Sequence, residues 1–178
     1  MNKQVKYIVI FLSAFLIRLV PFRAPNVEPV MAAIMPLGKI YSKFVAFAFG
    51  FFSIVLFDFV TSGLGIWTIV TALAYGLLGL GAHYFFQNRS GWKNYAAYAV
   101  IATIFYDAVT GLTIGPLFFH QSFFVSVIGQ IPFTIIHLLG NVSFAIVLSP
   151  VIERWVSVAS VKNMASQREK IEEIVLVG

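Results

Sequence analysis

The stretch from Phe44 to Gln87 reads FVAFAFGFFSIVLFDFVTSGLGIWTIVTALAYGLLGLGAHYFFQ, and Asp58 is its only Asp, Glu, Lys or Arg. At about 1.5 Å per residue, one helix of this length would far exceed the ~30 Å hydrocarbon core of a bilayer. The chain must therefore turn once, and the segment TSGLG at 61–65 is its flexible place. We predict a membrane hairpin with one carboxylate just before its tip and Trp67 just after it.

The composition of the whole chain is typical of a membrane protein. Its 178 residues are 60% hydrophobic and 11% charged, with a mean hydropathy of +0.90. We therefore expect one polytopic transmembrane domain over residues 1–156 and a polar cytoplasmic tail over residues 157–178. The chain has no cysteine, which excludes disulfides, thiol catalysis and thiolate metal sites. The net charge of +5 is expected to report membrane orientation, and nucleic acid is not an expected partner.

The other apolar runs complete an all-α, six-helix transmembrane bundle. A first helix is expected over Val5–Val20, ahead of a Pro-rich loop over residues 21–29. The second helix, over Val30–Ile40, is short and contains Pro36, which predicts a partial or kinked crossing. A fifth helix is expected over Tyr95–Thr113.

The uncharged run that follows, from Ala108 to Ile152, is too long for one pass. Gly115-Pro116 is expected to break it, because proline cannot continue the hydrogen bonding of a helix. Leu117–Gln130 is then a re-entrant or interfacial piece, and Ile131–Trp155 is the sixth helix.

The basic residues predict the orientation of the bundle. With six crossings and a cytoplasmic N-terminus, both ends lie inside, and Arg23 is the one basic loop residue outside, while Arg18 lies within the first helix. The basic residues then expected inside are Lys3, Lys6, Lys39, Lys43, Arg89, Lys93, Arg154, Lys162, Arg168 and Lys170.

Two acidic residues lie within the apolar helices, Asp58 and Asp107. The sequence DFVTSGL from Asp58 echoes DAVTGL from Asp107, which places two similar carboxylate–threonine turns on the outer side. A carboxylate at membrane depth is by default a functional hypothesis. The alternative is that each carboxylate accepts hydrogen bonds from the backbone of its own turn. No second ionisable group lies at helical spacing from either residue, which weakens a proton-relay role.

Further candidate binding residues form two stripes and a loop. Gln130, His137 and Asn141 are spaced by seven and four residues, so they share one helix face that could line a substrate cavity or bond a neighbouring helix. Trp67, Thr71 and Tyr75 form a second stripe that could stack on a flat ring, or simply pack and anchor at the interface. The first loop supplies Asn26 and Glu28.

The chain lacks patterns that would indicate catalysis or a cofactor. It has no nucleophile–base pair, zinc motif, paired glutamates or phosphate-binding loop, so we expect no enzyme activity, no cofactor and no metal site. Gly76, Gly79 and Gly81 are better explained by close packing of helices.

Several segments together form a family pattern. They are the Pro/Asn-containing first loop, the short Ala-rich helix, and FVAFAFGFFSIVLFD followed by WTIVTALAYGLLGLGA. With IHLLGN in the last helix, they resemble the S components, the substrate-binding subunits of energy-coupling factor (ECF) vitamin transporters. The resemblance covers about Leu16–Trp155. The family often has an Ala-x-x-x-Ala pair on the first helix, where this chain offers only Ser13-Ala14.

The resemblance implies a non-catalytic subunit of a prokaryotic plasma membrane importer, with its N- and C-termini in the cytoplasm. Such a subunit captures a vitamin or related micronutrient beneath the loops after the first, third and fifth helices. The aromatic-rich walls expected here favour a ring-bearing compound. Its partners are a membrane T component and two cytoplasmic ATPases. The residues expected to contact the substrate are Asn26, Glu28, Trp67, Thr71, Tyr75, Asp107, Gln130, His137 and Asn141, with Asp58 either structural or functional.

Two other classes of function stay open. A membrane scaffold similar to the MreD-like proteins of the cell-shape machinery would also be small, helical and non-catalytic, but would need no sealed polar cavity. An intramembrane enzyme or proton-coupled carrier would need a second buried acid–base partner near Asp58 or Asp107.

Overall fold

A computed structural model describes residues 2–21 and 29–177, with side chains described up to residue 157. Within these residues the protein is all-α, with six helices. They are α1 (Lys3–Leu19), α2 (Val30–Ile40), α3 (Lys43–Val60), α4 (Ile66–Phe85), α5 (Trp92–Phe118) and α6 (Phe123–Val177). Helices α3 to α6 are long and apolar enough to cross a membrane, and α2 is a shorter apolar helix. The predicted fold class is confirmed: the chain is a polytopic helical membrane protein.

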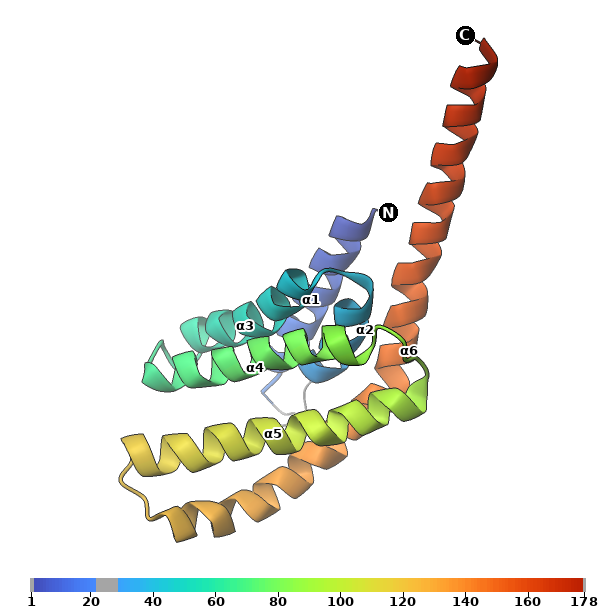
Figure 1. The fold of residues 1–178 in the computed structure, drawn as a ribbon. Coiled ribbons are helices and arrows are strands. Elements are labelled where there is room, and N and C mark those ends of the chain that lie inside the picture. The colour runs from blue at the N-terminus through green and yellow to red at the C-terminus, as the bar shows by residue number, and fades with distance from the viewer. Residues whose placement is uncertain (1, 22–28, 178) are drawn as a thin grey trace.

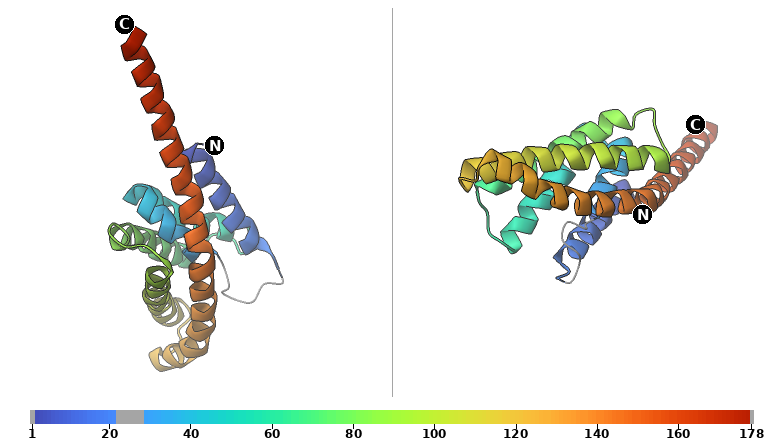
Figure 2. Two further views of the ribbon diagram at one scale, coloured as in Figure 1. Left: turned by 90° about the vertical axis from the view of Figure 1, so that its right-hand side faces the viewer. Right: turned by 90° about the horizontal axis from the view of Figure 1, so that it is seen from below.

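Two antiparallel hairpins and a buried short helix make up the bundle. Helices α3 and α4 form one hairpin, and α5 forms the other with the first part of α6 (Figure 1). Helix α6 then leaves α5, passes α2 and α1, and extends beyond the bundle to the C-terminus (Figures 1 and 2). Pro132 and Pro150 each remove one backbone donor from α6, and helices bend readily at such positions.

The predicted hairpin turn at 61–65 is confirmed, and local hydrogen bonds explain where its helices end. The Gly63 N–H donates to the Asp58 carbonyl at 2.7 Å, and Gly63 has a φ of 81°, which a residue with a Cβ rarely adopts. The Thr68 hydroxyl accepts a hydrogen bond from the Gly65 N–H at 3.2 Å, and this bond caps the start of α4.

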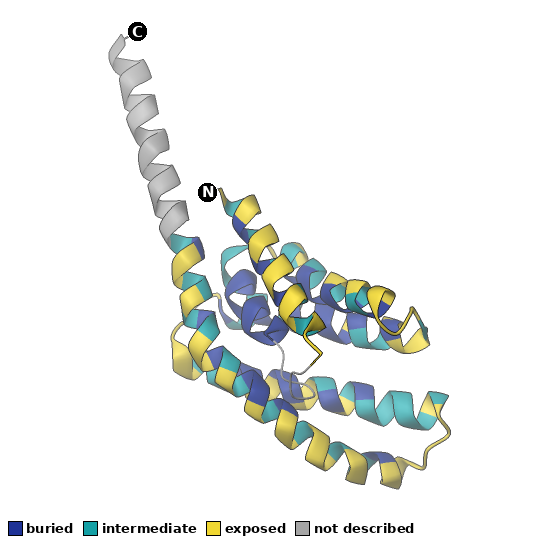
Figure 3. Ribbon diagram, turned by 180° about the vertical axis from the view of Figure 1, so that it is seen from behind, coloured by how far each residue is buried: buried dark blue, intermediate teal, exposed yellow. Residues whose placement is uncertain are grey.

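Helix α2 lies at the centre of the bundle. Every residue from Val30 to Gly38 is buried, and Figure 3 shows this helix almost wholly in the buried colour. Eleven residues span only about 16 Å, so α2 cannot cross a bilayer alone, as its length predicts. Its neighbours are mainly α3, α4 and α6, which enclose it.

Side chains from other helices form hydrogen bonds with two backbone carbonyls of α2. Pro36 has no N–H, so the carbonyl four residues earlier, at Ala32, loses its helical donor. The Ser149 hydroxyl of α6 donates to this carbonyl at 2.8 Å. At the other end of α2, Nδ1 of His83 lies 2.8 Å from the Gly38 carbonyl oxygen. Two buried backbone acceptors are thus satisfied without water.

Glycines bring α3 and α4 into close contact. A Cβ on Gly50 would lie 2.3 Å from the carbonyl oxygen of Tyr75, and a Cβ on Gly79 would lie 2.2 Å from that of Ala46. Both obstacles are backbone atoms that cannot turn aside, so the hairpin needs glycine at both positions.

The expected break at Gly115-Pro116 is wrong. Helix α5 continues to Phe118, the turn lies at residues 119–122, and α6 begins at Phe123, so Leu117–Gln130 is not a separate re-entrant piece. Gly115 has another role: a Cβ there would lie 2.7 Å from Oγ of Ser126, so its bare backbone lets the start of α6 fold against α5. The sixth helix also extends past Trp155, through the predicted tail, to Val177.

The basic residues outside the helix cores gather at one end of the bundle, called here the basic end. Nζ of Lys39 lies 2.8 Å from Oγ of Ser90 and 2.5 Å from Oε1 of Glu153, which joins α2, the α4–α5 loop and α6. Lys6 donates to the Trp155 carbonyl, bringing the start of α1 to the same place. The described residues of the basic end are Lys3, Lys6, Lys39, Lys43, Arg89, Lys93 and Arg154.

The Ser149–Ala32 hydrogen bond gives a stability prediction. Ser149→Ala should lower the free energy of unfolding by about 1–3 kcal/mol, because it leaves a buried carbonyl without a donor. The loss should shrink in a Pro36→Ala background, where the new N–H at position 36 can bond the Ala32 carbonyl. Thermal unfolding in detergent measures both effects.

Ser143→Ala is the matched control, because Ser143 is an exposed serine on the same helix, and it should change stability little. An equal loss for Ser149→Ala in both backgrounds would contradict the role given to Pro36.

Candidate functional site

Four buried polar side chains join α5 and α6, and we call them the α5–α6 polar cluster: Thr103, Asp107, His137 and Asn141. Each helix contributes two residues four positions apart, so both pairs lie on facing stripes. Nδ1 of His137 lies 2.7 Å from Oδ1 of Asp107, and Nδ2 of Asn141 donates to Oγ1 of Thr103 at 2.9 Å.

The cluster is buried. Relative exposure is 1% for Asp107, 3% for His137 and 0% for Asn141. A His137 ring that carries a proton on Nδ1 donates to Oδ1 of Asp107.

Two buried oxygens of the cluster have no hydrogen-bond partner among the described residues. They are Oδ2 of Asp107 and Oδ1 of Asn141. Both are acceptors, so together they suit a group that presents N–H donors or a positive charge. A buried polar atom is nearly always paired, which makes these two oxygens the strongest indication of a binding site in the described chain.

Aromatic rings extend the cluster toward α4. The Tyr106 ring meets the Tyr75 ring edge to face, with 4.6 Å between centroids, and lies 5.8 Å from the His137 ring. Phe133 meets the other side of His137, also at 5.8 Å. The polar atoms are therefore set in an aromatic surround contributed by three helices.

Four of the predicted binding residues come together here: Tyr75, Asp107, His137 and Asn141. Gln130 lies about two turns earlier on α6, where Gly111 makes room for it: a Cβ at Gly111 would meet the Gln130 side chain. Gln130 also lines a shallow apolar groove of about 310 Å³ on the outer face of α5 and α6.

Two predicted residues of α4 lie elsewhere. Trp67 is 38% exposed, and its ring folds back over Gly65, where a Cβ would collide with it. The Thr71 hydroxyl donates to the Trp67 carbonyl of its own helix at 2.9 Å. The predicted loop residues Asn26 and Glu28 lie outside the described residues.

The two acidic residues differ despite their sequence echo. Thr61 and Thr110, each three residues after an aspartate, both donate to the carbonyl four residues earlier in their own helix. The Asp58 carboxylate, however, accepts the Thr68 hydroxyl at 2.6 Å and joins the ends of α3 and α4. Asp107 joins α5 to α6 through His137 instead.

Sequence spacing along single helices did not reveal three members of this region: Thr103, Tyr106 and Phe133. Thr103 lies four residues before Asp107, which was a usable signal. The His137 partner of Asp107 comes from another helix, where spacing gives no indication. Within the described residues, no three His, Asp or Glu side chains converge as a metal site would require.

No protein-family model matches the chain, and no curated protein or solved structure matches it. The site is therefore interpreted from its own geometry.

The Asp107–His137 contact can be measured by a double-mutant cycle. Asp107→Ala and His137→Ala should each destabilise the protein, because removal of either leaves its buried partner unpaired. The double variant should lose less than the sum of the single variants, with a coupling of about 1–3 kcal/mol in the free energy of unfolding. Thermal or denaturant unfolding in detergent provides the values.

Asp58→Ala combined with His137→Ala is the control cycle, because Asp58 bonds to a different helix, and its effects should add within about 0.5 kcal/mol. Additivity in the Asp107 cycle as well would show that the contact contributes nothing.

Proposed function

We propose that the protein is the substrate-capture subunit of an ECF-type importer for a vitamin or related micronutrient. The α5–α6 polar cluster is the binding site, and the observation that supports it is the pair of buried acceptors, Oδ2 of Asp107 and Oδ1 of Asn141. A membrane T component and two cytoplasmic ATPases supply the energy. The chain itself binds and releases substrate without catalysing a reaction.

The chemistry of the site suggests what it captures. Two acceptor oxygens favour a substrate with N–H donors or a cationic nitrogen, and the rings of Tyr75, Tyr106 and Phe133 favour a flat or apolar body. Burial strengthens each polar contact because no water screens it. Asn26 and Glu28 of the first loop are proposed to close over the substrate.

A proton-coupled carrier is the second candidate, and the Asp107–His137 contact favours it over the scaffold alternative. Such a carrier needs a buried acid–base partner for a membrane carboxylate, and His137 meets that requirement at 2.7 Å. An MreD-like scaffold gives no reason for a polar cluster with unpaired acceptors.

Ligand retention tests the proposal. Native mass spectrometry of the full chain purified from its own cells should show a bound small molecule. Asn141→Ala and Asp107→Asn should each weaken its binding, by about 10–100-fold, because a buried polar group of the ligand loses its partner. Asn94→Ala and Asp58→Asn are the matched controls and should retain the ligand: Asn94 bonds only within the α4–α5 loop region, and Asp58 bonds to Thr68.

A folded protein that retains no small molecule, or one that retains it equally in all four variants, would contradict substrate capture at this cluster. Uptake that consumes a proton gradient and needs no ATPase would instead favour the proton-coupled carrier.

The basic end also predicts orientation. Because basic residues remain on the cytoplasmic side, we propose that both termini are cytoplasmic and that the α3–α4 and α5–α6 turns face outside. Reporter fusions should be cytoplasmic after Gly91 and external after Gly63 or His120. An external reading for the C-terminal end of α6 would overturn this orientation.

A further inference from the structure

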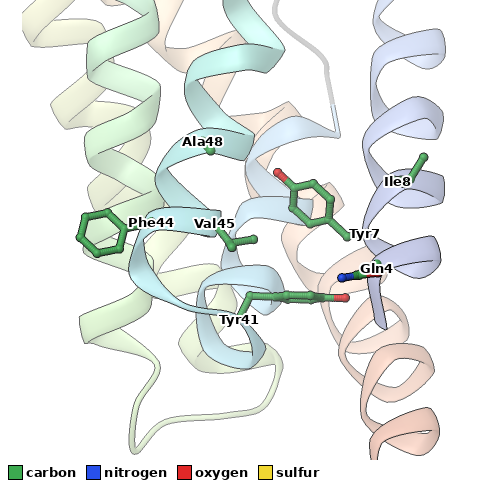
Figure 4. A pocket seen from close by; sticks show the side chains of 7 residues that line it. All are labelled: Gln4, Tyr7, Ile8, Tyr41, Phe44, Val45 and Ala48. Carbon is green, nitrogen blue, oxygen red and sulfur yellow. The ribbon is translucent and has the colours of Figure 1, made fainter. Parts of the chain in front are cut away.

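A groove runs between α1 and α3 at the basic end of the bundle. It has a volume of about 400 Å³ and is lined by Gln4, Tyr7, Ile8, Tyr41, Phe44, Val45 and Ala48. Figure 4 shows Tyr41 reaching across from the α2–α3 junction toward Gln4, with Tyr7 on α1 above it and Ala48 farther along α3. The groove is open along its length and lies apart from the α5–α6 polar cluster.

The walls of the groove are apolar, and aromatic contacts set its width. Tyr7 and Phe11 of α1 meet the Phe49 ring edge to face, at 5.6 and 5.3 Å between centroids, and this contact holds α1 beside α3. Toward the basic end the two helices leave a gap, and Phe44 at its edge is 73% exposed. In a bilayer such a surface is covered by an apolar group.

The mouth of the groove carries positive charge that has no acidic partner. No Asp or Glu occurs among residues 2–21 and 29–57 of the described chain. Lys6 is directed to the Trp155 carbonyl and Lys39 to Glu153. Lys3 and Lys43, the basic residues next to the lining residues Gln4 and Phe44, have no ion pair in the described residues. Nζ of Lys43 lies 5.3 Å from the centroid of the Phe44 ring, at the edge of the groove.

Tyr41 joins the backbone of Lys3 to the α2–α3 junction. Its hydroxyl donates to the Lys3 carbonyl at 2.5 Å, which ties the start of α1 to the segment that leads into Lys43. Burial raises the pKa of the Tyr41 phenol, so this hydroxyl keeps its proton at neutral pH. The amide of Gln4 adds a hydrogen-bonding group at the same mouth.

The other open grooves differ in charge. One of about 460 Å³ on α6 is lined by Leu139, Gly140, Ser143, Phe144, Val147 and Leu148, and the groove over α5 and α6 is lined only by apolar residues, Thr134 and Gln130. None of the three linings includes a Lys or Arg. The α1–α3 groove differs because Lys3 and Lys43 are direct neighbours in the sequence of its lining residues Gln4 and Phe44, whereas no Lys or Arg adjoins a lining residue of the other two.

We propose that the α1–α3 groove binds an anionic phospholipid, with one acyl chain along Ile8, Val45 and Ala48 and the headgroup phosphate on Lys3 and Lys43. The acyl chain covers the apolar walls, and the headgroup supplies the negative charge that the described residues lack at this mouth. This site is independent of the proposed substrate.

A lipid titration of the full chain, monitored by native mass spectrometry, tests the site. Phosphatidylglycerol should bind more tightly than phosphatidylcholine with the same acyl chains. Lys3→Gln with Lys43→Gln should weaken phosphatidylglycerol binding about 25-fold, or about fivefold for each lysine, and should leave phosphatidylcholine unchanged. Ala48→Trp should weaken both lipids, because the ring fills the trough.

Two control variants are matched to these changes. Lys93→Gln removes an exposed lysine of the same basic end, and Ser143→Trp fills the α6 groove; both should leave phosphatidylglycerol binding within twofold of the original protein. The lysine variants change half-buried side chains that make no ion pair in the described residues, so the test holds even if Ala48→Trp does not fold.

Three outcomes would overturn the proposal. Equal affinity for the two lipids, or an unchanged affinity in the double lysine variant, would remove the headgroup site. Full competition by inorganic phosphate would show that the lysines bind a free anion. Loss of lipid in exchange for a co-purifying membrane subunit, blocked by Ala48→Trp, would make the groove a protein interface.

Discussion

The structure depends on the fact that α2 is too short to cross a membrane. No water in the bilayer core can complete its backbone hydrogen bonds, so protein must surround it and supply the missing donors. Helices α3, α4 and α6 enclose it, and Ser149 and His83 reach its carbonyls at Ala32 and Gly38. The Pro36 ring, which would weaken an isolated helix, is tolerated here because Ser149 replaces the lost donor. The course of α6 past α2 follows from the same requirement, since Ser149 and Glu153 both bond to groups of α2.

The two hairpins are held together in different ways. Helices α3 and α4 approach through glycines that face backbone carbonyls, and the Asp58–Thr68 hydrogen bond joins their ends. Helices α5 and α6 also use a glycine, at Gly111, but it admits a polar side chain, and deeper in the interface polar groups pair directly. Interhelical hydrogen bonds in membranes contribute modestly to stability, so apolar packing alone could have held this hairpin. The unpaired oxygens of Asp107 and Asn141 add nothing to stability, which is why function is the better explanation for them.

Hydrophobic run length predicted most helices and the turn at 61–65, because a bilayer fixes how long an apolar helix must be. It failed at Gly115-Pro116, where the rule that proline ends a helix competes with the cost of exposing backbone in lipid, and the helix continues to Phe118. Spacing within a helix placed His137 and Asn141 on one buried face, but it could not show that Asp107 lies opposite them. It also placed Trp67 with Tyr75, whereas the buried face of α4 passes through Thr68, Ala72 and Tyr75, so Trp67 lies at its exposed edge. Contacts between helices, rather than helices themselves, were the part that the sequence left open.

The Asp107–His137 contact links the two candidate functions physically. Oδ1 of Asp107 faces Nδ1 of His137, and Oδ2 has no hydrogen-bond partner among the described residues. In the capture proposal Oδ2 of Asp107 contacts the substrate, and in the carrier proposal the Asp107–His137 pair holds the transported proton. Both proposals therefore depend on the same carboxylate. What separates a capture subunit from a carrier is the source of the energy for reorientation, not the chemistry of this site.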